Sequence, residues 1–387
     1  MGAYGLAVDA GSVPAVAAAE PRVAPRRPPS LHIPSLDGLR ALSFLIVFMA
    51  HSGVGIILAV PGGFGVTVFF FLSGFLITTL MRVEHETTGR VNVRFFYIRR
   101  VLRILPPFYL ILALACVLTL THLLPGELEP GAVLAQVLHF SNYWFIAFGS
   151  GGAAAGTVPY WSLAVEEHFY LVFPFLFLTL NRFLSYRGQA RTYWALCAIV
   201  CVWRCVLVVW FGVPEDRTYL ATDTRFDSIL FGCALAMGMN PVVDRPVGSE
   251  RVWKWGILPA GLALLLFTFT YRAPWFRETI RYSLQGIALT PVFIAAIRFP
   301  HWLPFRILNN KAVAFVGVLS FTLYLSHEIA VIALYTWAPQ LRPYQIALLA
   351  FAIAFTFSVV IHQLVEKPSA ALRKRLAREA SAAPATA

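Results

Sequence analysis

The chain has 387 residues, of which 58% are hydrophobic and only 13% are charged. This composition excludes an ordinary soluble globular protein and indicates a membrane protein with several spans. The formal net charge is +12, but the basic residues stand between apolar segments and at both chain ends, as topology signals do. We therefore expect the lipid bilayer, and no nucleic acid, as a partner of this chain.

The first residues are rich in Ala, Pro and Gly and lack the apolar core of a signal peptide, so 1–32 are expected to form a disordered cytoplasmic tail. A single membrane domain is expected over 33–370, followed by a basic cytoplasmic tail over 371–387. Apolar segments that predict helices fall near the following positions: 38–60, 64–81, 104–124, 132–148, 161–180, 193–211, 226–239, 255–270, 281–297, 314–336 and 345–362.

The basic residues indicate how many of these segments cross the bilayer. Both tails and the 82–103 connection are basic and are expected on the cytoplasmic side, which requires an even number of crossings. The segment at 132–148 is interrupted by polar residues, so it is expected to be re-entrant or interfacial. The prediction is an all-α helical bundle with about ten transmembrane helices in an inner or plasma membrane, with both termini cytoplasmic.

The first apolar segment, LDGLRALSFLIVFMAH, carries three polar side chains of interest. On a helix, Arg40 and His51 are about 20° apart around the axis and about 16 Å apart along it, so they share one face. Asp37 lies one turn before Arg40 and can hold its guanidinium at the membrane edge, which leaves His51 near the middle of the bilayer. A polar side chain at that depth is costly and is a functional candidate. The structural alternative is a packing histidine with a snorkelling arginine.

Three arginines, Arg99, Arg100 and Arg103, precede the next long span in RFFYIRRVLRILPPFY. Arg103 lies one helical turn beyond the other two, so the three form a positive patch at the cytoplasmic surface. Guanidinium groups bind phosphate oxygens through paired hydrogen bonds, which makes the patch a candidate phosphate site. Positive-inside anchoring and attraction to anionic lipid head groups are the alternatives.

Ser162, Glu166 and Tyr170 recur at a spacing of four in VPYWSLAVEEHFYLVFP, at the predicted outer start of a span. The spacing places a carboxylate between a hydroxyl and a phenol on one stripe of the helix. A carboxylate beside an apolar run needs a cavity or a cationic partner. Acidic residues are also common at helix starts because of the helix dipole, which is the structural alternative.

Further polar residues interrupt the later apolar segments. Tyr324 and His327 lie on one polar stripe in SFTLYLSHE, which should face protein or water and not lipid. Arg225 and Asp227 place two charges at the predicted outer end of another span. Arg204 is isolated in an apolar run, and a buried carboxylate is the only partner that we expect for it.

Together these stretches resemble the membrane-bound acyltransferase-3 family, whose members O-acylate surface polysaccharides, peptidoglycan and some antibiotics. Arg40 and His51 match the family's motif of arginine, ten residues and histidine, and Arg100 and Arg103 match its R-x-x-R. FFFLSGFLI, WSLAVEEHFY with Glu166, SFTLYLSHE and the closing VEKP are similar to its other signatures. The larger members carry an additional extracytoplasmic hydrolase-like domain, whereas this sequence resembles the single-domain members.

The resemblance implies transfer of an acyl group, most often acetyl, from acyl-coenzyme A to a hydroxyl of a carbohydrate or glycoconjugate. Acyl-coenzyme A is then a co-substrate, and neither a permanently bound cofactor nor a metal is expected. A neutral imidazole can accept the hydroxyl proton, so His51 is the expected general base and His327 the competing one. Arg40, Arg100 and Arg103 are expected to bind the donor.

Glu166 is expected at the acceptor end of the cavity, opposite the arginines, where it would recognise the sugar or orient a catalytic histidine. Six other residues are expected to contact substrate: Asp37, Ser162, Arg225, Asp227, Tyr324 and His327. Two other functional classes remain open. A transporter or flippase of a lipid-linked glycan would also need buried charges, although no broken helices mark corresponding halves. A membrane sensor or assembly partner without chemistry is the third class.

Overall fold

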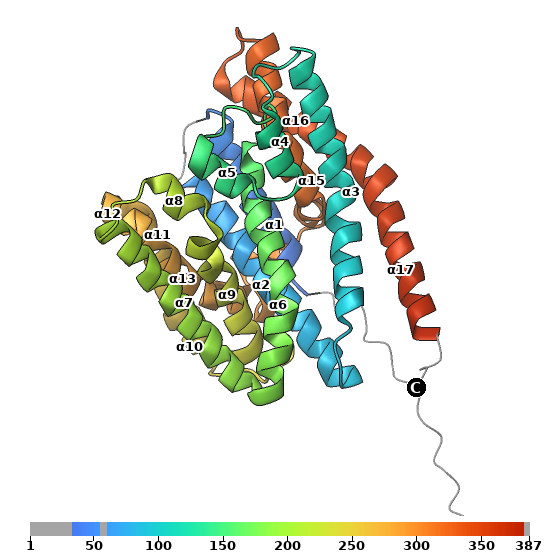
Figure 1. Cartoon of the computed structure of the whole chain (residues 1–387). Coiled ribbons are helices and arrows are strands. Elements are labelled where there is room, and N and C mark those ends of the chain that lie inside the picture. Colours follow the sequence, from blue (N-terminus) through green and yellow to red (C-terminus); the bar gives the residue numbers. More distant parts are fainter. Residues whose placement is uncertain (1–32, 55–59, 383–387) are drawn as a thin grey trace, which may run out of the picture.

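The computed structural model describes residues 33–54 and 60–382, with side chains described as far as residue 377. These residues form helices joined by loops, without a β-strand in the described part (Figure 1). The helices are α1 Leu36–His51, α2 Gly62–Thr88, α3 Val93–Leu120, α4 Pro130–Val137, α5 Ser141–Phe148, α6 Trp161–Phe183, α7 Tyr186–Val209, α8 Glu215–Leu220, α9 Thr222–Gly238, α10 Glu250–Val252, α11 Leu258–Thr270, α12 Pro274–Glu278, α13 Arg281–Arg298, α14 Leu303–Leu308, α15 Lys311–Trp337, α16 Pro343–Ile361 and α17 Lys367–Ala382.

Seven helical stretches in the described chain are long and apolar enough to cross a membrane, which makes this a multi-pass membrane protein. They are α2, α3, α6 with the 3₁₀ turn before it, α7, α10–α11, α15 and α16–α17. Helices α1, α9 and α13 have only 16, 17 and 18 residues, or about 24 to 27 Å of length at 1.5 Å per residue. They lie inside the same bundle, and the total of about ten crossings stays a prediction.

The segment at 132–148 forms two eight-residue helices, α4 and α5, joined by a short turn. Each is about 12 Å long, which is too short to cross a bilayer. Both lie at the end of the bundle away from the first residues of α3 (Figure 1). Their placement in the membrane, re-entrant or interfacial, is a prediction that remains to be tested.

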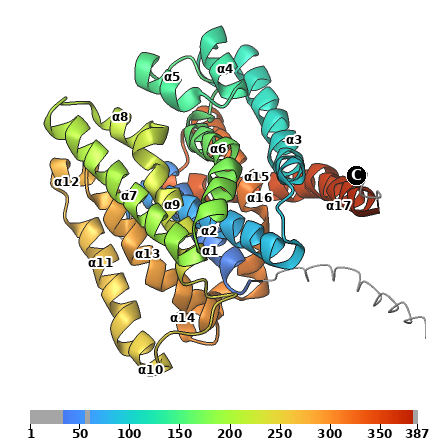
Figure 2. The ribbon, with the colours of Figure 1, turned by 60° about the horizontal axis from the view of Figure 1, so that its bottom comes forward.

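Helix α2 lies at the centre of the bundle and packs against α1 and α9, and α9 packs in turn against α7 (Figure 2). Small residues allow α2 and α9 to cross at close distance. A Cβ atom on Gly74 of α2 would clash with the backbone of Ile229, and one on Gly232 of α9 with the backbone of Phe71. The two backbones therefore approach closely only because both positions are glycine, as in other membrane helix pairs.

A similar contact joins α1 to α15. A Cβ atom on Gly317 of α15 would clash with the carbonyl group of Asp37, so the start of α1 lies directly on α15. This packing runs along both helices and brings the end of α1 beside the middle of α15. Because α1 ends at His51, and does not continue toward residue 60 as its apolar sequence predicted, the His51 side chain stands at a helix end.

The structure describes the second of the two predicted tails but not the first. Residues 1–32 lie outside the described residues, so the predicted disordered tail there is not tested. The basic residues after 370 belong to α17, which continues from α16 through a π-helical turn, His362–Glu366, and packs along α3. The helix therefore extends well beyond the expected end of the membrane domain.

Candidate active site

A cavity is formed where α1, α2, α3, α6 and α15 meet, and we call it the arginine cavity. It is narrow, with a volume of about 80 Å³. Its polar lining consists of Arg40, Ser73, Arg100, Arg103, Ser162, Glu166, Tyr170, Ser320 and Tyr324. The structure thus brings together the three arginines that the sequence assigned to the donor, although α1 and α3 lie far apart in the chain.

Neighbouring side chains fix the positions of these arginines. Nη1 of Arg40 lies 3.2 Å from Oδ1 of Asp37, as the spacing on α1 predicted. The Arg100 guanidinium lies over the Tyr170 ring, 5.2 Å from its centre. Arg99 differs from its neighbours, because its Nη2 lies 3.0 Å from Oε2 of Glu84 and it does not line the arginine cavity. Only two of the three clustered arginines of α3 therefore face the cavity.

Glu166 is in a different place from the one that the sequence predicted. It lines the arginine cavity beside Arg100 and Arg103, and Ser73 of α2 donates a hydrogen bond of 2.5 Å to its Oε1. The prediction placed Glu166 at the opposite, acceptor end. The two groups meet because of their positions along the helices. Glu166 lies in the second turn of α6, and the Arg100 guanidinium lies over the ring of Tyr170, one turn further along α6.

His51 and His327 form a hydrogen-bonded pair across the α1–α15 contact. Nδ1 of His51 lies 2.9 Å from Nε2 of His327, and the planes of the two rings are nearly parallel, with an angle of 9° between them. His327 is completely buried, whereas 36% of the His51 side chain is exposed. The sequence predicted both histidines as functional candidates but not their contact.

The hydrogen-bond partners determine which nitrogen atoms carry protons in the neutral pair. Nδ1 of His327 lies 2.8 Å from the carbonyl oxygen of Tyr324, and a carbonyl oxygen can only accept, so this nitrogen is the donor. Nε2 of His327 must then accept the proton of Nδ1 of His51. Nε2 of His51 is left with a free lone pair, whereas both nitrogens of His327 are occupied. The arrangement makes His51, and not His327, able to take a proton from another molecule.

Glu328 is the third titratable group at this place. Its Oε2 lies 3.9 Å from Nδ1 of His51 and has no hydrogen-bond partner among the described residues. A carboxylate at that distance can stabilise an imidazolium that forms during proton transfer. Single ligand atoms of His51, His327 and Glu328 lie within 4.8 Å of one another, a spacing that suits a metal ion. A metal there would have to displace the shared proton between the two histidines.

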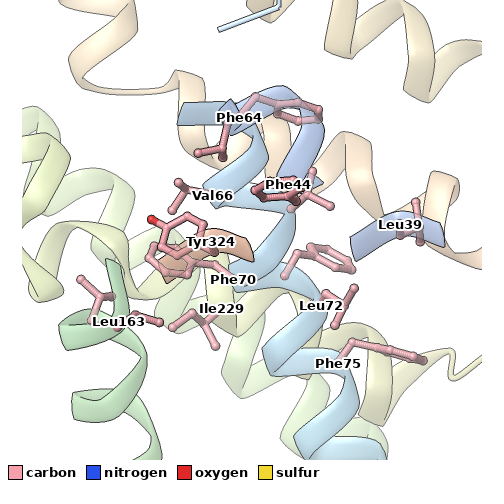
Figure 3. Close-up of a cluster of buried hydrophobic side chains, with 14 of the residues drawn as sticks. Leu39, Phe44, Phe64, Val66, Phe70, Leu72, Phe75, Leu163, Ile229 and Tyr324 are labelled. Atoms are coloured by element: carbon pink, nitrogen blue, oxygen red, sulfur yellow. The ribbon is translucent and has the colours of Figure 1, made fainter. Parts of the chain in front are cut away.

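His51 and Glu328 line a second cavity of about 510 Å³, which we call the histidine cavity. Its volume falls in the range of about 300–1,000 Å³ that is usual for small-molecule sites. Val66 and Tyr324 line both this cavity and the arginine cavity. Figure 3 shows Tyr324 and Val66 within the cluster of buried side chains, and the centre of the Tyr324 ring lies 6.0 Å from that of Phe69. The two cavities are therefore separated by a wall of side chains, and Tyr324 is the polar member of that wall.

The hydroxyl group of Tyr324 is held by two neighbours on the α6 side. It lies 2.7 Å from the Ser162 hydroxyl oxygen and donates a hydrogen bond of 2.9 Å to the carbonyl oxygen of Pro159. Ser162 and Tyr324, both predicted to contact substrate, thus lie together between the cavities. Asp37 lines neither cavity and contacts Arg40 instead.

Arg225 and Asp227 are completely buried, and neither lines these two cavities. Oδ2 of Asp227 lies 2.6 Å from Nη2 of Arg204, whose side chain is also completely buried. Ser283 bonds to both members of this pair. The expectation that Arg204 pairs with a buried carboxylate is confirmed, with Asp227 as its partner, and a contact of Asp227 with substrate stays a prediction. The Arg225 guanidinium lies within 6 Å of the centres of four aromatic rings, those of Phe70, Trp161, Tyr219 and Tyr282.

Sequence reasoning did not single out three residues that the structure places at these cavities: Ser73, Glu328 and Tyr219. Ser73 and Glu328 stand inside FFFLSGFLI and SFTLYLSHE, so the segments were identified but not these members. A serine or glutamate inside an apolar segment is a usable signal, because it must find a partner there. Tyr219 lies in the short helix α8 between two spans, where nothing in the sequence distinguishes it.

Sequence comparison finds relatives that are named as O-acetyltransferases. The chain is 31% identical over 354 residues to the peptidoglycan O-acetyltransferase OatA of Listeria monocytogenes (serovar 1/2a, strain ATCC BAA-679 / EGD-e), covering 87% of this chain and 56% of that protein. It is 27% identical over 350 residues to the O-acetyltransferase OatA of Staphylococcus aureus (strain NCTC 8325 / PS 47), covering 87% of this chain and 57% of that protein.

The chain therefore spans little more than half the length of these curated relatives. No solved structure matches it. The sequence profile of the acyltransferase domain matches residues 33–363, which contain α1 to α16 and every residue of both cavities. Since this match covers most of the chain, the protein belongs to the acyltransferase-3 family.

Proposed function

We propose that this protein is a membrane O-acyltransferase that transfers an acyl group, in the first instance acetyl, from acyl-coenzyme A to a hydroxyl of a carbohydrate or glycoconjugate. The donor enters the arginine cavity, the acceptor enters the histidine cavity, and His51 is the general base. Both termini and the basic end of α3 face the cytoplasm in this proposal, which is where acyl-coenzyme A is available. The O-acetyltransferase names of the relatives support acetyl as the group transferred.

One observation carries the proposal. His51, whose Nε2 keeps a free lone pair in this tautomer, lines a cavity that shares Tyr324 with the cavity of the three arginines. A phosphate-binding site, a proton acceptor and a common wall are the parts that acyl transfer from a phosphorylated thioester to a hydroxyl requires.

The reaction follows from these positions. Nε2 of His51 takes the proton of the acceptor hydroxyl as its oxygen attacks the thioester carbonyl carbon. The new carbon–oxygen bond forms, the carbon–sulfur bond breaks, and the leaving thiolate receives the proton from the His51 imidazolium. Glu328 stabilises the positive charge of the imidazolium between these steps. The thioester must therefore reach the wall that contains Tyr324, while the phosphates stay at Arg100 and Arg103.

The donor assignment predicts the effect of removing the two cavity-facing arginines of α3. Arg100→Ala/Arg103→Ala should raise the KM for acetyl-coenzyme A by about 100-fold or more, because each charged hydrogen bond contributes about 1.5–3 kcal/mol. The acceptor KM and the rate at saturating donor should change much less. Arg94→Ala is the matched control, because Arg94 lies on the same helix but is exposed and lines no part of the arginine cavity.

Steady-state kinetics with each substrate varied in turn measures these constants. An unchanged donor KM combined with a raised acceptor KM would show that the arginines serve the acceptor. Arg103→Lys should restore only part of the donor affinity, because an ammonium group keeps the charge but lacks the planar guanidinium fork.

The observed position of Glu166 predicts a donor effect for Glu166→Gln. Among the described residues, Glu166 is the only carboxylate lining a cavity that contains three guanidinium groups, and without it these groups repel one another and shift. We expect kcat/KM for the donor to fall about 10-fold, which corresponds to about 1.4 kcal/mol, with the acceptor KM unchanged. Glu167→Gln is the control, since Glu167 is the next residue of α6 but does not line the cavity. An effect on the acceptor KM alone would show that Glu166 serves acceptor binding, as the sequence predicted.

A further inference from the structure

A third cavity lies beside the histidine cavity, and we call it the side cavity. It has a volume of about 210 Å³ and is formed by the start of α2 and by α8, α12 and α13. Its polar lining is Glu215, Asp216, Tyr219, Arg277, Arg281 and Tyr282, with Gln285. Gly63, Asp216 and Tyr219 line both this cavity and the histidine cavity. A molecule in the histidine cavity can therefore place a neighbouring group in the side cavity.

The side cavity is lined by two arginines and two carboxylates, and among them the buried Arg281 and the exposed Asp216 have no ion-pair partner in the described chain. Arg277 pairs with Glu215 at 2.8 Å. Arg281 is 93% buried, donates a hydrogen bond of 2.9 Å from Nη2 to the Tyr282 hydroxyl, and has no hydrogen-bond partner at Nε. In the described part of the chain no carboxylate lies within ion-pair distance of Arg281. A buried guanidinium without a counterion is costly, and the cost is removed when an anion binds beside it.

A second buried cation lies behind the cavity wall. Arg225 is completely buried and donates from Nη2 to Thr67 at 3.0 Å, while its Nε and Nη1 have no partner in the described residues. Its guanidinium lies 3.9 Å from the centre of the Tyr282 ring and 5.5 Å from that of Tyr219. These two rings line the side cavity, so Arg225 adds its positive field to that of Arg281.

The backbone at the start of α13 also favours an anion in the side cavity. Helix α13 starts at Arg281, and the residue before it, Ile280, provides no side-chain cap for the first N–H groups. An uncapped helix start carries a partial positive charge and favours an anion. Tyr219 and Tyr282 offer the aromatic surface and hydroxyl groups that suit a sugar ring. The cavity thus combines a buried cation, an uncapped helix start and aromatic walls.

We propose that the side cavity binds a negatively charged group of the acceptor glycan, a carboxylate or a phosphate, while the acylated sugar lies in the histidine cavity. This inference rests on the proposed function and narrows it to acidic glycans. Arg281 then selects the acceptor: it holds the anion, and the hydroxyl of the adjoining sugar is presented to His51. A neutral glycan would leave Arg281 without a partner and would bind more weakly.

A binding experiment tests the anion site without any acyl transfer. Thermal unfolding of the purified full-length protein in detergent, at fixed ionic strength and with coenzyme A present to occupy the arginine cavity, is measured with glucuronate, inorganic phosphate or glucose. Glucuronate or phosphate should raise the unfolding temperature of the wild type, and glucose should not. The effect should disappear in Arg281→Gln and persist in part in Arg281→Lys. Arg251→Gln, an exposed arginine of α10, is the control.

The pattern across the probes distinguishes the two anion sources: a response to glucuronate indicates a carboxylate, and a response to phosphate alone indicates a phosphate. Equal responses to glucuronate, phosphate and glucose, or responses that Arg281→Gln leaves intact, would overturn the inference. If Arg281→Gln does not fold, a reduced anion response in Arg281→Lys supports the site, and an undiminished response in Arg281→Lys contradicts it.

A kinetic experiment then connects the site to catalysis. Two oligosaccharides that differ only in a carboxylate or its carboxamide are offered as acceptors with saturating acetyl-coenzyme A. The acidic one should have the higher kcat/KM, and Arg281→Gln should remove that preference, a change of about 10- to 100-fold. Equal acylation of both by the wild type refutes the inference but leaves the proposed function standing. An anion response in the unfolding experiment without acylation of either would instead count against the proposed function.

Discussion

His51→Ala should lose about 10² to 10⁴ of the acyl transfer rate, because a general base typically contributes that much. The loss should appear in kcat, and the KM for acetyl-coenzyme A should stay close to that of the wild type. The physical reason is the fixed tautomer: Nε2 of His51 is the one free proton acceptor of the histidine pair. Single-turnover kinetics with purified protein, together with a donor-binding measurement, separates the two effects.

His327→Ala provides the comparison within the same pair. It removes the group that orients the His51 ring but leaves Nε2 of His51 able to accept a proton, so the loss should be smaller, about 10- to 100-fold. His327→Gln should recover part of it, since a side-chain carbonyl oxygen can accept from Nδ1 of His51. His301→Ala, at an exposed histidine, should have no effect. A folded His51→Ala with normal transfer, beside an inactive His327→Ala, would make His327 the base.

Removing one partner of the Arg204–Asp227 pair should destabilise the protein by about 3–5 kcal/mol, because the remaining charge is left buried and unpaired. Both side chains are completely buried, and Nη2 of Arg204 lies 2.6 Å from Oδ2 of Asp227. We expect Arg204→Met and Asp227→Asn each to unfold at clearly lower temperature or denaturant concentration in detergent. The double variant Arg204→Met/Asp227→Leu should recover much of the lost stability, since it leaves no charge in the core.

The exposed pair of Arg277 and Glu215 is the control for this comparison. Its side chains are 34% and 48% exposed, and Glu215→Gln should cost at most about 1 kcal/mol. Single variants of the buried pair with unchanged stability and abolished transfer would show that Asp227 acts in the reaction. That result would support the prediction, made from the sequence, that Asp227 contacts substrate.

The helices and the polar residues of the site were largely predictable from the sequence. Each expected apolar segment contains a helix, because hydrophobic runs bounded by charged or Pro- and Gly-containing connections leave few alternatives in a membrane. The stripe of Ser162, Glu166 and Tyr170 faces one cavity, as its spacing of four requires. The contact of Asp37 with Arg40 followed from their spacing on α1.

Contacts between distant segments were not predictable. His51 and His327 are 276 positions apart, and they meet only because the glycine contact at Gly317 lets α1 lie directly on α15. A single sequence contains no information on how deep one helix lies relative to another. For that reason Glu166 was expected opposite the arginines, although it lies beside them. The end of α1 at His51 was missed because the following residues are also apolar.

The most direct test of the account uses purified protein in detergent or liposomes with acetyl-coenzyme A and a candidate acidic glycan. Release of the coenzyme A thiol and acylation of the glycan are measured together in the wild type, His51→Ala and His301→Ala. We expect the wild type and His301→Ala to release thiol in step with glycan acylation, and His51→Ala to do neither at a comparable rate while still binding coenzyme A. Movement of the glycan across the membrane without acylation, equally in the wild type and in His51→Ala, would contradict this expectation and favour a transporter.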